Sequence, residues 1–204
     1  MRKLLLAALV LVSGLRAEDL FNGRDLAGWE LITTPAATAA SACHVRPNGV
    51  LLLDGKPSGY LQTTATHANY RLHVEWRWPG SPGNGGILLH IASGPKDRVW
   101  PLSLQVQTKH KYVGDLLPMA GISFGEPLAP GLKVPARPHI APDSEKPAGE
   151  WNTCDVVCRG DTVEVTVNGV VQNRITSCSV AAGHIGFQFE GVPYELRHLT
   201  LTAL

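Results

Sequence analysis

Two stretches decide the fold: Asn69-Tyr-Arg-Leu-His-Val-Glu-Trp-Arg-Trp78 and Trp100-Pro-Leu-Ser-Leu-Gln-Val-Gln-Thr-Lys-His110. In the first, apolar and charged side chains alternate, with Tyr70, Leu72, Val74, Trp76 and Trp78 in one phase and Arg71, His73, Glu75 and Arg77 in the other. Successive side chains of a β-strand point to opposite faces of its sheet. The second stretch places Gln105 and Gln107 at the same two-residue period. The pattern predicts strands with one apolar face and one densely polar face.

Length and charge limit the classes of protein that fit. The chain has 204 residues, a formal net charge of +1 and 44% hydrophobic residues. This length suits one domain with a sizeable core, and the near-neutral charge excludes a broad electrostatic interface with nucleic acid.

The N-terminus has the features of an export signal. Arg2 and Lys3 precede an apolar run over 4–12, which is too short for a stable membrane anchor, and Ala17 is a plausible cleavage point. We therefore expect a signal peptide over 1–17, one mature domain over 18–204 and export to the periplasm or the outside. The alternative is that this run forms a buried N-terminal element. No later stretch is apolar and long enough to span a membrane.

Export would permit disulfides, and the chain has four cysteines: Cys43, Cys154, Cys158 and Cys178. Four cysteines allow three pairings. We favour Cys158–Cys178, because these residues end two neighbouring strand candidates, and Cys43–Cys154 is the weaker second bond. A zinc site at Cys154 and Cys158 is disfavoured, since residues four apart in a strand lie about 13 Å from each other.

Short alternating runs broken by Gly, Pro, Asn and Asp recur along the chain, and helical periodicity is hard to find. They predict strands over 49–54, 59–63, 69–78, 86–92, 102–109, 151–159, 162–167, 170–176, 184–189 and 193–202. The Asn168-Gly169 pair is a strong hairpin signal. The sequence thus predicts an all-β, antiparallel two-sheet sandwich. The proline-rich segment 126–150 is either a functional loop or an extended excursion.

Ordered motifs resemble one known family. They are Leu20-Phe-Asn-Gly-Arg-Asp-Leu-Ala-Gly-Trp29, Tyr70-Arg-Leu-His-Val-Glu-Trp-Arg77, Asn84-Gly-Gly-Ile-Leu-Leu-His90, Ser103-Leu-Gln-Val-Gln107, Gly149-Glu-Trp-Asn152, Gly186-Phe-Gln-Phe-Glu-Gly191 and Tyr194-Glu-Leu-Arg-His198. The set is similar to the 3-keto-disaccharide hydrolase family, and it covers nearly the whole mature chain. The resemblance implies a concanavalin A-like jelly-roll sandwich.

The resemblance also implies cleavage of glycosides that carry a ketone at C3. Such a ketone acidifies the C2 proton, so that a base can start an elimination that water addition completes. The site needs a base, a donor or cation for the enolate oxygen and an acid for the leaving group. The chain departs from the family at Gln105, where relatives often have Glu, and glutamine cannot exchange a proton at ordinary pH.

The candidate catalytic groups are two carboxylates and one imidazole. Glu75 lies on the polar face of its strand, Glu190 shares a strand face with Gln188, and His110 has a free pKa near 6.5. For each of them a solvated, ion-paired or structural role is the alternative. We expect Glu75, Gln107, His110 and Glu190 to converge on one concave face.

Further polar and aromatic groups are candidates for substrate binding: Arg77, His90, Trp100, Gln105, Gln107, Asp115 and Gln188. Amides both donate and accept hydrogen bonds, which suits sugar hydroxyls. Trp78 or Trp100 could stack on a sugar ring, and Arg77 or Arg197 could neutralise an enolate.

No cofactor signature is evident. A divalent metal is possible, because Glu75, His90, His110, Asp115 and Glu190 are ligand types, but their spacing is not diagnostic. The expected partner is a carbohydrate, and we expect an exported enzyme acting on 3-keto-glycosides. The alternative is a lectin-like carbohydrate-binding domain without turnover, which Gln105 favours, and a third is a structural envelope domain.

Overall fold

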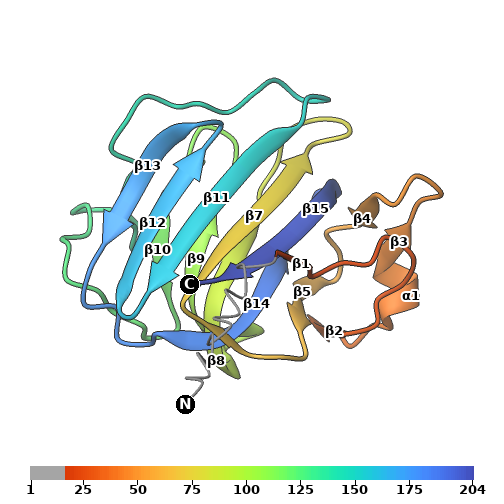
Figure 1. Ribbon diagram of the computed structural model, residues 1–204, viewed down its shortest axis with the longest axis horizontal. Helices are drawn as coiled ribbons and strands as arrows, with labels where there is room; N and C mark the ends of the chain where they lie inside the picture. The colour runs from red at the N-terminus through yellow and green to blue at the C-terminus, as the bar shows by residue number, and fades with distance from the viewer. Residues whose placement is uncertain (1–16) are drawn as a thin grey trace, which may run out of the picture.

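The computed structural model describes residues 17–204, which form two antiparallel sheets packed face to face (Figure 1). In spatial order the first sheet comprises β13 (Val170–Ile175), β12 (Thr162–Val167), β11 (Asn152–Arg159), β7 (Tyr70–Arg77), β15 (Tyr194–Ala203), β4 (Leu51–Leu53) and β3 (Cys43–Val45), with β1 (Glu18–Asp19) beside β15. We call it the β7 sheet. A short helix, α1 (Ala39–Ala42), precedes β3.

We call the second sheet the β9 sheet, and it carries Gln105, Gln107 and Gln188. In spatial order it comprises β10 (Leu116–Met119), β9 (Trp100–Gln107), β8 (Gly86–Asp97), β14 (Ala182–Phe189), β5 (Ser58–Thr63) and β2 (Trp29–Thr34), with β6 (His67–Ala68) beside β14. All ten strands predicted from the sequence are present, and the all-β sandwich is confirmed.

Two-residue alternation determines which side chains enter the core. In β7 the residues Tyr70, Leu72, Val74 and Trp76 are at most 1% exposed, whereas the residues between them reach the surface. From the β9 sheet, Leu104 and Phe187 join the same core cluster. The core therefore lies between the sheets, and each sheet has an outward face of its own that looks away from the other sheet.

The hairpin between β8 and β9 folds back over the outward face of the β9 sheet. Its pairing shifts register between Leu89 and Ser93 and again before Asp97. A Cβ on Gly94 would lie 2.5 Å from the Tyr60 hydroxyl oxygen, so the hairpin backbone contacts the outward side of β5. A small cluster of Tyr60, Leu88 and Ile91 fills this outward side. We call residues 93–100 the hairpin tip.

Three features differ from the sequence predictions or lie beyond the structure. The strands β1, β2, β3, β6 and β10 were not predicted, because they are short or lie in or beside a segment rich in small residues. All four cysteines are buried free thiols, so the predicted Cys158–Cys178 bond is absent from the structure. Burial is the main cause of the raised pKa of Cys158, and the Cys178 thiol adds a smaller contribution. The signal-peptide prediction falls almost wholly outside the described residues.

The proline-rich segment 126–150 is an extended excursion with almost no regular structure. One of its attachments is Glu145, whose side chain is 3% exposed. The carboxylate accepts a hydrogen bond from Trp78 Nε1 at 3.1 Å and lies 2.7 Å from His110 Nδ1. Over residues 17–204, no helix has the length and apolar character that crossing a bilayer requires.

Candidate functional site

Three glutamine side chains meet on the outward face of the β9 sheet. Gln105 Nε2 donates to Gln107 Oε1 at 3.2 Å and to Gln188 Oε1 at 3.1 Å. The contact between Gln105 and Gln188 is possible because Gly86 of β8, the strand between β9 and β14, has no side chain. A Cβ on Gly86 would lie 2.6 Å from Gln105 Nε2. Gln105 Oε1 is buried and has no hydrogen-bond partner among residues 17–204. The three amides therefore lie together, and their pairing leaves one acceptor without a partner.

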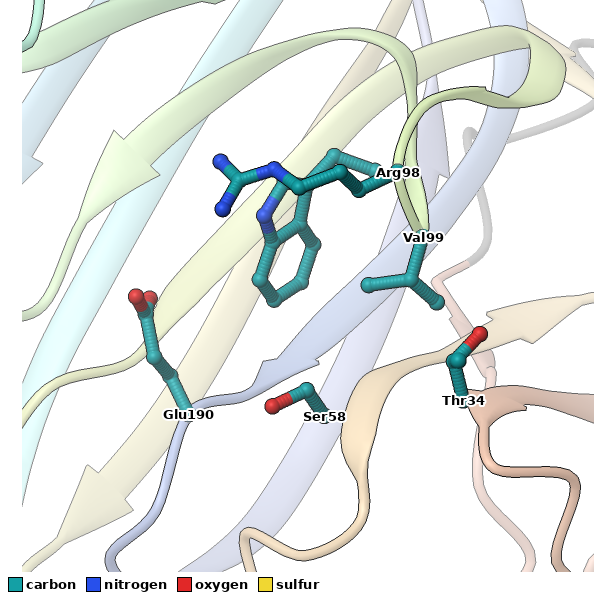
Figure 2. Close-up of a pocket in the computed structure, with 6 residues that line it drawn as sticks. Thr34, Ser58, Arg98, Val99 and Glu190 are labelled. Atoms are coloured by element: carbon teal, nitrogen blue, oxygen red, sulfur yellow. The ribbon is translucent and has the colours of Figure 1, made fainter.

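A pocket of about 520 Å³ opens between the hairpin tip and the ends of three strands. Its lining residues are Thr34, Ser58, Arg98, Val99, Trp100 and Glu190. Figure 2 shows Arg98 and Val99 on one side, and Glu190, Ser58 and Thr34 on the other. Glu190 follows β14 in phase with Gln188, so the pocket and the glutamine row share one outward face. Two residues proposed from the sequence, Trp100 and Glu190, thus line the same pocket.

The environment of Glu190 makes its carboxylate a stronger base than usual. Burial raises the pKa of Glu190, and the positive charges of Lys109 and Arg98 offset this only in part. A carboxyl group with a raised pKa is a better proton acceptor and is also more readily protonated near neutral pH. Beside it stand a guanidinium group, an indole and two hydroxyl groups. This set can transfer a proton, stabilise a negative oxygen and contact an apolar ring face.

Glu75 does not join this site, and the expectation that it would is wrong. It lies on the outward face of the β7 sheet, on the far side of the core, opposite Arg197 of β15. Arg197 Nε donates to Glu75 Oε2 at 2.6 Å, and His198 Nδ1 lies 2.7 Å from Glu75 Oε1. Burial acts to raise the pKa of Glu75, but the hydrogen bonds from His198 and Arg197 outweigh it, and the pKa is lowered. A paired carboxylate with a lowered pKa is a weak base.

Arg77 lies on the same far face as Glu75. Its Nε donates to Glu195 Oε2 at 2.6 Å, and its guanidinium lies 4.5 Å from the centre of the Trp151 ring. Glu195 is only 3% exposed and also pairs with Arg46 at 2.9 Å. Arg77 therefore belongs to an ion-pair network that covers the β7 sheet and does not reach the pocket.

His90 points into the core, contrary to the prediction that it contacts a ligand. It has a left-handed backbone with φ of 53°, is fully buried and lies with its ring 6.0 Å from that of Tyr70. Burial lowers the pKa of His90, and the nearby Val180 backbone opposes this. Within the described part of the chain, neither ring nitrogen has a hydrogen-bond partner of normal geometry. The backbone irregularity after Leu89 turns this side chain away from the outward face.

His110 and Asp115 hold loops in place. His110 pairs with Glu145 of the proline-rich segment, as described above. Asp115 Oδ1 accepts from the His139 backbone at 2.8 Å and lies 2.6 Å from His139 Nδ1. Neither residue lines the pocket. Their partners, Glu145 and His139, have no sequence spacing that would have revealed them.

Within the described part of the chain, no cluster of three or more His, Cys, Asp or Glu side chains is arranged to hold a metal ion. The candidate ligands are dispersed: Glu75 lies on one outward face, Glu190 on the other and His90 in the core.

The fold and the motifs agree with a known family. Residues 16–202 match the family described as a 3-keto-alpha-glucoside-1,2-lyase-like domain. The chain belongs to this family. A comparison with curated proteins found no match.

Solved structures share the sandwich at low identity. A Parabacteroides distasonis protein with a provisional glycosyl hydrolase designation is 20% identical, with a TM-score of 0.68 over 92% of this chain and 94% of that one. The carbohydrate-binding module CBM66 from Bacillus subtilis is 11% identical, with a TM-score of 0.60 over 86% and 96%. A Bacillus licheniformis β-glucanase is 11% identical, with a TM-score of 0.58 over 95% and 99%. At these identities the likeness shows the fold alone.

Proposed function

We propose that this chain is a carbohydrate-active enzyme that binds a 3-keto-glycoside on the outward face of the β9 sheet and cleaves it by elimination and hydration. The observation that carries the proposal is Glu190, a carboxyl with a raised pKa in a pocket shared with Arg98 and Trp100. Family membership and structural relatives named for glycoside hydrolysis and carbohydrate binding support the substrate class.

Sugar recognition falls to the pocket wall, with the buried glutamine row beside it as support. The hydroxyls of Thr34 and Ser58 can donate hydrogen bonds to a sugar or accept them from it. Trp100 contributes an indole to the pocket, and aromatic surfaces pack against the apolar faces of pyranose rings.

Glu190 supplies the proton transfers. Its carboxylate removes the C2 proton, and the electron pair of the C–H bond forms a C2=C3 bond as the ketone becomes an enolate. The enolate then returns to a ketone while a C1=C2 bond forms and the C1–O bond to the aglycone breaks. The protonated Glu190 gives its proton to the departing oxygen, and water later adds across C1=C2. Because no oxocarbenium ion is formed, a second carboxylate is not required.

The second candidate function is carbohydrate binding without turnover. It is favoured by the glutamine row, whose central group, Gln105, stands where relatives often have a carboxylate and cannot exchange a proton. The raised pKa of Glu190 favours the enzyme instead, because a binding module has no need of a stronger base.

The test is aglycone release from a 3-keto-glucoside by the purified protein, by Glu190→Gln and by the control Glu150→Gln, which changes an exposed carboxylate outside the pocket. We expect release by the wild type and the control, and at least a 100-fold lower rate for Glu190→Gln. Binding without release by the wild type would favour the binding module. Full activity of Glu190→Gln would remove the acid–base assignment.

We also propose that the N-terminal segment directs export. The basis is sequence alone: Arg2 and Lys3, the apolar run 4–12 and Ala17. Mature protein in the periplasm or medium should begin near Glu18 by N-terminal sequencing, and an uncleaved chain that stays in the cytoplasm would contradict the proposal.

A further inference from the structure

Arg98 occupies a turn position that glycine normally takes. Asp97 and Trp100 pair across the end of the hairpin, so Arg98 and Val99 form a two-residue turn. Arg98 has φ of 57°, in the left-handed region. In two-residue hairpin turns a positive φ favours Gly, Asn or Asp, because the Cβ of other residues crowds the backbone. An arginine here is a locally unfavourable choice, and strained residues of this kind cluster at functional sites.

The Arg98 side chain makes few stabilising contacts with the rest of the described protein. It is 79% exposed, and its one ion pair in the described chain joins Nε to Asp97 Oδ1 at 3.7 Å. Asp97 is 62% exposed, so solvent screens this contact. The contacts of the Arg98 side chain therefore do not offset the strain of its backbone conformation.

The hairpin tip nevertheless holds Arg98 in a defined place. Val99 and Trp100 are buried, with 5% and 8% exposure, and Gly94 packs its backbone against the Tyr60 hydroxyl. The tip therefore has fixed contacts on both sides of the turn. From it the guanidinium extends over the side of the pocket where Glu190 lies (Figure 2).

Other cations are less suited to act at this pocket. Arg77 and Arg197 are bound to Glu195 and Glu75 on the opposite face of the sandwich. Lys109 is near Glu190, but its ammonium lies 5.0 Å from the centre of the Tyr112 ring, in a cation–π contact. Among the residues that line the pocket, Arg98 is the one cation, and its ion pair with Asp97 is long and exposed.

We propose that Arg98 is a catalytic residue that donates hydrogen bonds to the C3 oxygen of the substrate and stabilises it as an enolate. This inference rests on the proposed function. When Glu190 removes the C2 proton, the negative charge moves from the carboxylate to the ketone oxygen, and a guanidinium with several unused N–H groups can bind it there. The interaction is strongest with the enolate, so it lowers the barrier more than it tightens ground-state binding. The strained turn serves to present the guanidinium over the reacting atoms.

The test compares Arg98→Gly with Lys96→Gln, which removes one exposed positive charge from the same hairpin tip. Arg98→Gly should lower kcat for a 3-keto-glucoside at least 100-fold with a small change in KM, and added guanidinium ion at non-denaturing concentration should restore part of the rate. The same variant should raise the melting temperature by about 2 °C, because glycine relieves the strained turn. Lys96→Gln should match the wild type.

The outcomes separate this inference from the proposed function. If the wild type releases no aglycone, the proposed function and the Arg98 role both fail. If the wild type is active and Arg98→Gly keeps kcat within threefold, the Arg98 role alone is overturned. A lower melting temperature for Arg98→Gly would overturn the strain argument and give the arginine a structural role.

Discussion

Replacing His90 with leucine should remove an acid-dependent loss of stability. His90 is fully buried and lacks hydrogen-bond partners of normal geometry, and burial lowers its pKa below the ordinary value of 6.5. The folded protein therefore resists protonation of this imidazole, while the unfolded chain accepts the proton freely. This group therefore costs no stability above pH 6.5, and it lowers the stability of the folded protein as the pH falls below that value.

The size of the effect follows from the proton-binding difference. At pH 7.5 the imidazole is neutral in both states and contributes almost nothing. At pH 5.5 protonation of the unfolded chain alone costs the folded state up to about 1.4 kcal/mol. The stability at pH 7.5 itself should change little. Removal of a buried unpaired polar group gains about 1–2 kcal/mol, and leucine in a left-handed conformation costs about 1–2 kcal/mol.

The assay is urea unfolding followed by tryptophan fluorescence, for the wild type and His90→Leu at pH 7.5 and pH 5.5. Between these pH values the wild type should lose up to about 1.4 kcal/mol more unfolding free energy than the variant does. Equal losses in the two proteins would show that His90 is not a neutral core residue, and the reasoning on its burial would be refuted.

Glu75 and Glu145 should stabilise the fold without taking part in catalysis. Glu75→Gln should lower the unfolding free energy by about 1 kcal/mol, since its partners are partly exposed, and should leave aglycone release unchanged; a large loss of release would return Glu75 to the catalytic site. Because pairing with Arg197 and His198 lowers the pKa of Glu75, this contribution is present above the ordinary value of 4.5 and is lost below it. Glu145→Gln weakens buried charge-assisted hydrogen bonds and should cost about 2 kcal/mol. It should speed limited proteolysis within 126–150, and an unchanged cleavage rate would contradict its role as the anchor.

Local periodicity predicted the strands and the face of each strand on which a side chain lies. It did not predict which side chains from different strands would lie close together. The alternation in β7 correctly separated Trp76 from Glu75. It could not show which sheet β7 would join, and in a sandwich the two polar faces look in opposite directions. Gln105 and Gln188 meet because β9 and β14 both flank β8. Glu75 and Glu190 lie apart because their strands belong to different sheets.

Backbone irregularities explain the other differences. Continued alternation along β8 would place His90 beside Leu88 on the outward face. The left-handed residue at this point turns the ring into the core and moves Ile91 outward instead. The same strand carries Arg98, whose position over the pocket depends on the folding back of the hairpin tip. Neither the bulges nor this reversal has a distinctive residue pattern in the sequence.

The buried thiols make the native protein suitable for site-specific labelling. Burial raises the pKa of Cys43 and Cys158 to about 12, and it also raises the pKa of Cys154 and Cys178. Such thiols stay protonated near neutral pH and are shielded from maleimides and other alkylating reagents. A single cysteine introduced at an exposed site such as Lys96 could then carry a fluorophore without removal of the native four. The fluorophore would report directly on whether the hairpin tip changes its environment when a sugar is added.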